Sequence, residues 1–87
     1  MIFIKHRINT LEQLEETSPK YGVEIDLRSY KKDLILNHEP FENGVLFEKW
    51  LTEFKHKYLI LNVKEEGLEE RCIALMNKFR ITNFFFL

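Results

Sequence analysis

The sequence predicts an α/β protein with a mainly parallel sheet. Five short runs of β-branched or aromatic residues are typical of strands, and three stretches with helical spacing lie between them. Strands that alternate with helices are typical of parallel sheets. With 87 residues the chain is expected to form a single domain over residues 1–87.

The predicted strands are short and apolar, which suits strands buried on both faces. The last of them has four consecutive apolar residues, so the chain is expected either to continue or to pair this strand with a partner. In chain order the five strands are Ile2–Ile4, Val23–Leu27, Leu34–Leu36, Tyr58–Val63 and Phe84–Leu87.

Three helices are predicted from apolar periodicity, over 10–17, 47–54 and 68–79. In the second, Phe47, Trp50 and Phe54 share one stripe, which indicates a core-facing side. The only cysteine, Cys72, falls in the third pattern and is expected to be a small core residue, so no intramolecular disulfide forms.

The connection between the second and third strands is too short for a parallel crossover. Only residues 28–33 separate the two apolar runs, whereas a crossover needs about a dozen residues. A β-hairpin is therefore predicted here. If it turns near Lys32, Asp26 and His38 stand opposite each other on one face.

Charge and hydropathy exclude several classes of partner. The net charge is −1, with both signs interspersed, whereas nucleic-acid binders usually carry a basic excess. No stretch approaches the roughly 20 apolar residues of a membrane span, and the apolar N-terminal run is too short for a signal peptide. The sequence therefore predicts no nucleic-acid partner, no membrane span and a cytoplasmic location.

Polar residues gather where the predicted strands end. Parallel α/β folds place their active sites at the carboxyl ends of strands. The candidates are His6 and Arg7 after the first strand, Glu24 and Asp26 in the second, His38 after the third, and Asn62 and Lys64 at the end of the fourth.

Each candidate also has a simpler interpretation. Glu24 and Asp26 would also suit the solvated face of an edge hairpin. The two histidines could be ordinary strand-end surface residues, and Lys64 could be a plain surface charge. A further histidine, His56, lies in the segment KHK and is expected at the surface.

The order of these motifs resembles the N-terminal half of the glycerophosphodiester phosphodiesterase family. The matching segments are HR at 6–7, NT at 9–10, EID at 24–26, KKD at 31–33, the histidine of NHE at 38, LFEKWL at 46–51 and LILNVK at 59–64. The family folds as a (β/α)8 barrel of the TIM type. The resemblance therefore implies the first half of a (β/α) barrel, with the hairpin between its second and third strands.

The resemblance also implies a reaction and a role for each residue. It predicts a phosphoric diester hydrolase acting on a small-molecule phosphodiester, with His6 and His38 as general acid and base. It places a divalent cation, Ca²⁺ or Mg²⁺, on Glu24 and Asp26, with Asn62 as a further ligand. In the same scheme Arg7 and Lys64 contact the substrate phosphate, and these charges suit phosphodiester cleavage.

Three departures from the family pattern leave a second hypothesis open. Asn62 stands where the family has a metal-binding Glu, the carboxylate expected before the Asn-Thr pair is missing, and Glu39 replaces the usual Asp. The alternative is a catalytically degenerate protein that binds a phosphorylated ligand or serves as a structural half-barrel. If 87 residues are the whole product, the open edges of half a barrel would favour pairing of two copies.

Overall fold

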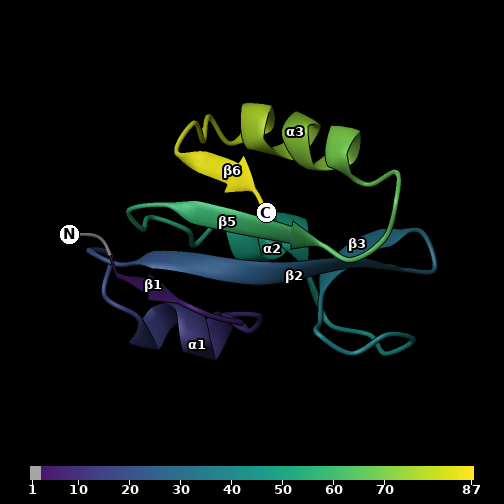
Figure 1. Ribbon diagram of the computed structural model, residues 1–87, viewed down its shortest axis with the longest axis horizontal. Helices are drawn as coiled ribbons and strands as arrows, with labels where there is room; N and C mark the ends of the chain where they lie inside the picture. Colours follow the sequence, from purple (N-terminus) through teal and green to yellow (C-terminus); the bar gives the residue numbers. More distant parts are fainter. Residues whose placement is uncertain (1–2) are drawn as a thin grey trace.

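A six-stranded mixed sheet organises the chain, which this computed structural model describes over residues 3–87 (Figure 1). The strand order is β4-β3-β2-β5-β6, and β1 pairs with β2 outside this path. The strands are β1 (Ile4–Lys5), β2 (Gly22–Tyr30), β3 (Asp33–Leu36), β4 (Val45–Leu46), β5 (Leu59–Val63) and β6 (Phe84–Phe86).

Three helices accompany the sheet. They are α1 (Leu11–Glu16), α2 (Phe47–Leu51) and α3 (Glu69–Lys78), with α1 and α3 toward opposite sides of the view in Figure 1. A capping box starts α1, in which the Thr10 hydroxyl accepts the Gln13 N–H and the Gln13 side chain returns to the Thr10 N–H. The predicted helices and strands are confirmed, with ends shifted by a few residues. Of the predicted first strand, Ile2 lies outside the described residues.

The prediction of half a (β/α) barrel is wrong. The sheet is mixed, because β2–β3 and β3–β4 pair antiparallel whereas β1–β2, β2–β5 and β5–β6 pair parallel. From β2 to β4 the chain makes two antiparallel connections with no helix between them, so β/α units do not alternate. The sheet still ends in two edge strands, β4 and β6, so the pairing of two copies stays a prediction.

The molecule is a small globule with one core. Its radius of gyration is 11.8 Å, against about 12 Å expected for a compact chain of this length. Alternate residues of β2 point into the core, where Val23, Ile25 and Leu27 have no exposed surface. The core also takes in helical side chains, including the predicted Phe47, Trp50 and Cys72.

The structure rules out the alternative interpretation of Glu24 and Asp26 and shows that the surface prediction for His56 is wrong. Glu24 and Asp26 lie on the opposite face of β2 from the core residues but are still only 8% and 1% exposed, so they are not a solvated hairpin face. His56 is 4% exposed, stacks on Phe54 and places its Nε2 2.7 Å from the carbonyl oxygen of Thr17. The surface prediction rested on the two flanking lysines of the KHK segment, which do not determine the burial of the ring between them.

No helix within residues 3–87 is long and apolar enough to cross a membrane.

Candidate active site

The candidate residues surround an interruption in one edge of β2. On that edge β1 pairs with Gly22 and Val23, and β3 takes over from Leu27 onward. Between them the edge is completed by loops: the Ile8 N–H donates to the Glu24 carbonyl at 2.9 Å, and the Asn37 N–H to the Asp26 carbonyl at 3.1 Å. The segments that carry His6 and His38 therefore both meet β2 at Glu24 and Asp26.

Glu24 holds the segment after β1. Its Oε1 lies 3.3 Å from His6 Nδ1 and accepts the Arg7 backbone N–H at 3.1 Å. Arg7 has a φ of 54°, in the left-handed region that is costly for residues other than glycine. Its backbone, and not its guanidinium, contacts the carboxylate, so the predicted phosphate contact of Arg7 stays a prediction.

Asp26 is held by a residue to which the sequence assigned no role. The Asn9 side chain donates from Nδ2 to Asp26 Oδ2 at 3.0 Å, and its Oδ1 accepts the Asp26 N–H at 2.9 Å. Asn9 is fixed in turn because its own N–H donates to the Gln13 side chain of the α1 capping box. The start of α1 thereby orients the more deeply buried carboxylate.

His38 reaches Asp26 despite a register that differs by one residue from the expected one. The hairpin itself is confirmed, but Leu27 pairs with Leu36, so Asn37, and not His38, stands opposite Asp26. His38 lies just beyond the strand, and its Nδ1 is still 3.7 Å from Asp26 Oδ2. At that distance Nδ1 is a buried atom without a hydrogen-bond partner.

Arg28 holds the backbone that carries His38. Its Nη2 donates to the His38 carbonyl oxygen at 2.8 Å, and its Nε reaches the same oxygen at 3.2 Å. Arg28 shares a face of β2 with Glu24 and Asp26 because all three occupy even positions. That spacing is the sequence signal by which its role could have been found.

Asn62 and Lys64 approach the carboxylates from β5. Asn62 pairs with Asp26 in the parallel register, and its Nδ2 is 3.5 Å from Glu24 Oε2. Lys64 follows β5 directly, and its Nζ is 3.6 Å from Asp26 Oδ1. Both therefore belong to the cluster, and Lys64 is not a plain surface charge.

The donor set does not fit the divalent cation that the family resemblance implies. A hard cation of this kind takes six or more oxygen ligands at about 2.0–2.6 Å. Here all four carboxylate oxygens of Glu24 and Asp26 face nitrogen atoms, and Asn62 turns its amide nitrogen toward Glu24. Across residues 3–87 no three His, Cys, Asp or Glu side chains come close enough to hold a metal.

What the cluster offers chemically is two histidine–carboxylate pairs. His6 points Nδ1 at Glu24 and His38 points Nδ1 at Asp26, so each ring leaves its Nε2 away from the carboxylate. A carboxylate beside one ring nitrogen favours an orientation of the ring in which the other nitrogen is free for proton transfer, as acid–base catalysis requires. The exposure differs, at 73% for the His6 side chain and 36% for that of His38.

A hollow of about 450 Å³ is lined by residues that include Arg28, Tyr30 and Phe41. Glu65 forms another wall and accepts hydrogen bonds from the hydroxyl and the N–H of Ser29, at 2.6 and 3.0 Å. The side-chain hydrogen bond from Ser29 lowers the pKa of Glu65 below its usual value.

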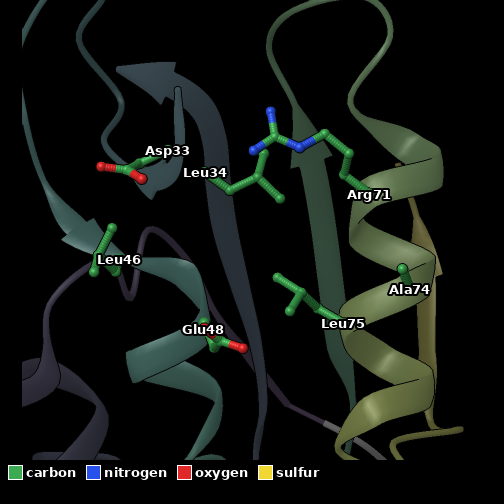
Figure 2. A pocket seen from close by; sticks show the side chains of 7 residues that line it. All are labelled: Asp33, Leu34, Leu46, Glu48, Arg71, Ala74 and Leu75. Carbon is green, nitrogen blue, oxygen red and sulfur yellow. The ribbon is translucent and has the colours of Figure 1, made fainter. Parts of the chain in front are cut away.

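A second hollow, of about 380 Å³, lies away from the candidate residues. Figure 2 shows Arg71 and Leu75 of α3 on one side of it and Asp33, Leu46 and Glu48 on the other. Its lining includes none of the candidate site residues.

Searches against protein-family models, curated proteins and solved structures found no match to the chain. The likeness to glycerophosphodiester phosphodiesterases therefore stays a prediction, and function must be argued from the geometry of the cluster.

Proposed function

We propose that the cluster around Glu24 and Asp26 binds a small phosphodiester and cleaves it by acid–base catalysis. The observation that carries the proposal is the pair of histidine–carboxylate contacts, His6 to Glu24 at 3.3 Å and His38 to Asp26 at 3.7 Å. One histidine takes the proton of an attacking hydroxyl as the new P–O bond forms. The other gives a proton to the leaving oxygen as the old P–O bond breaks.

Charge balance supports a singly charged substrate. The carboxylates of Glu24 and Asp26 are matched in number by the cations of Arg7 and Lys64. The further cation beside His38, Arg28, interacts with a third carboxylate, Glu65, so the site is formally neutral while both histidines are neutral. A phosphodiester brings one negative charge, which a single protonated histidine offsets. A phosphomonoester brings close to two, and its second charge would face two buried carboxylates. We therefore expect diesters to be preferred over monoesters.

Histidine variants test this proposal directly. Hydrolysis of bis(4-nitrophenyl) phosphate and of a glycerophosphodiester is measured for the parent, His6→Gln and His38→Gln, with 4-nitrophenyl phosphate as the monoester control. General acid–base catalysis contributes about 10²–10⁴-fold, and each variant should lose activity on that scale while its melting temperature shows that it is folded. His38→Gln with the parent's rate would contradict the acid–base role.

The second candidate function is binding of a phosphorylated ligand without turnover. It is favoured by Asn62, which leaves the cluster with two carboxylates. A glycerophosphodiester that raises the melting temperature without being hydrolysed would point to binding alone.

A further inference from the structure

We infer that the Lys64 ammonium takes the place of a divalent cation at this site, so that the cluster works without a metal. The inference rests on the proposed function for the site's purpose, but its evidence is the surroundings of the two carboxylates. Each of the four carboxylate oxygens of Glu24 and Asp26 lies near a nitrogen atom of the protein, so none of them is left for a metal ion.

Burial of Asp26 makes a nearby counter-ion favourable. A carboxylate removed from water loses several kcal/mol of hydration unless charge or hydrogen bonds replace it. Asp26 is 1% exposed, and its side chain receives one neutral hydrogen bond, from Asn9. Among the described residues, Lys64 is the permanently charged cation that forms an ion pair with this carboxylate, with its Nζ 3.6 Å from Asp26 Oδ1.

Asn62, two residues before Lys64, is a second observation that supports the inference. It lies opposite Asp26 in the parallel register and contacts Glu24 through its amide nitrogen. The amide NH₂ group of Asn62 is a hydrogen-bond donor and cannot ligate a metal ion. It can donate to Glu24 while Lys64 neutralises Asp26. Asn62 and Lys64 together therefore replace the charge that a Glu and a metal ion would otherwise contribute.

Metal titrations of parent and variant proteins test the inference without an activity assay. Chelator-treated parent protein is titrated with CaCl₂ and MgCl₂ while its melting temperature is followed, and no shift is expected. Lys64→Met leaves Asp26 without its permanent counter-ion. We expect its melting temperature to fall by about 4–8 °C or more, and Ca²⁺ to restore part of that loss.

Lys78→Met is the matched control. Lys78 pairs with Glu48, but both side chains are substantially exposed, at 63% and 49%. Surface pairs contribute little, so this variant should neither lose much stability nor respond to Ca²⁺.

Two results would overturn the inference. One is parent protein stabilised by Ca²⁺ or Mg²⁺ in a way that Glu24→Gln abolishes. The other is a folded Lys64→Met protein with the parent's melting temperature and no response to metal. If Lys64→Met does not fold, isothermal calorimetry of the parent with Ca²⁺ decides the question: heat of binding refutes the inference, and its absence supports it. Neither overturning result affects the histidine assay, which tests the proposed function separately.

Discussion

Asp26 is the residue on which the site depends most, because it is charged, buried and in contact with three other segments of the chain. It meets the segment after β1 through Asn9, the loop after β3 through His38 and the end of β5 through Lys64. Each of these contacts lowers the cost of burying the carboxylate. The same residue therefore helps to close the fold and to gather the candidate catalytic groups.

Replacing Asn9 should expose this dependence. Asn9→Ala removes one hydrogen bond to the Asp26 carboxylate and one from its N–H, leaving buried polar groups without partners. The expected loss is about 1–3 kcal/mol in the free energy of unfolding, measured by denaturant titration. Asn77→Ala, at an exposed position of α3, is the matched control and should change stability by less than about 0.5 kcal/mol. Equal effects at the two positions would contradict the role of Asn9.

The β2–β3 hairpin and the loop after it set the position of His38 at the scale of elements. Tyr30 pairs with Asp33, so the turn has two residues, and the first, Lys31, has a φ of 59°. After β3, Gly44 lies against the carbonyl of Leu36, where a Cβ would overlap the oxygen. A tight turn at one end and a close backbone contact at the other leave the intervening loop little freedom to move His38.

The backbone of the turn predicts opposite responses at two adjacent lysines. Lys31 has a left-handed backbone and Lys32 does not. Lys31→Gly should therefore be more stable than Lys31→Ala by about 1 kcal/mol. Lys32→Ala should be more stable than Lys32→Gly by about 0.4–1 kcal/mol. Comparing Gly with Ala at each position cancels the loss of the lysine side chain. The same order at both positions, by denaturant unfolding, would show that the turn has another conformation.

Cys72 belongs to the hydrophobic core of the molecule, so the ionisation of its thiol depends on whether that core is intact. The side chain is fully buried, and burial raises the pKa of the thiol to about 11 from its usual value of 9.0. The unfolded chain therefore releases this proton at a lower pH than the folded protein does. The stability contributed by the neutral thiol is complete below about pH 9 and is lost as the pH rises toward 11.

An alkaline titration measures this contribution. The free energy of unfolding of the parent should fall relative to that of Cys72→Ala between pH 9 and pH 10.5, because only the parent gains a thiolate on unfolding. Below pH 8.5 the difference between the two proteins should be constant. The difference isolates the thiol from the lysines and tyrosines, which titrate in both proteins. A constant difference over the whole range would mean that Cys72 is accessible in the folded state.

Local patterns in the sequence determined much of this protein. The apolar runs predicted the strands, except for the two-residue β4, whose Val45-Leu46 is too short to show a period. The connection length predicted the hairpin, and the strand-end positions predicted that His6, Glu24, Asp26, His38, Asn62 and Lys64 come together. These succeed because side-chain periodicity and chain length act over a few residues.

Only the tertiary structure decided how the strands assemble and what surrounds the carboxylates. The predicted hairpin brings β3 back antiparallel to β2, and β4 then pairs antiparallel with β3 without a helix between them. The two-residue β4 left no pattern in the sequence, so the mixed sheet was not predicted. Burial of His56 and the contacts of Asn9 and Arg28 depend on segments far apart in sequence. A nearby positive charge offsets part of the cost of burying a carboxylate, but only the folded chain shows that Lys64 is near enough to Asp26 to provide that charge.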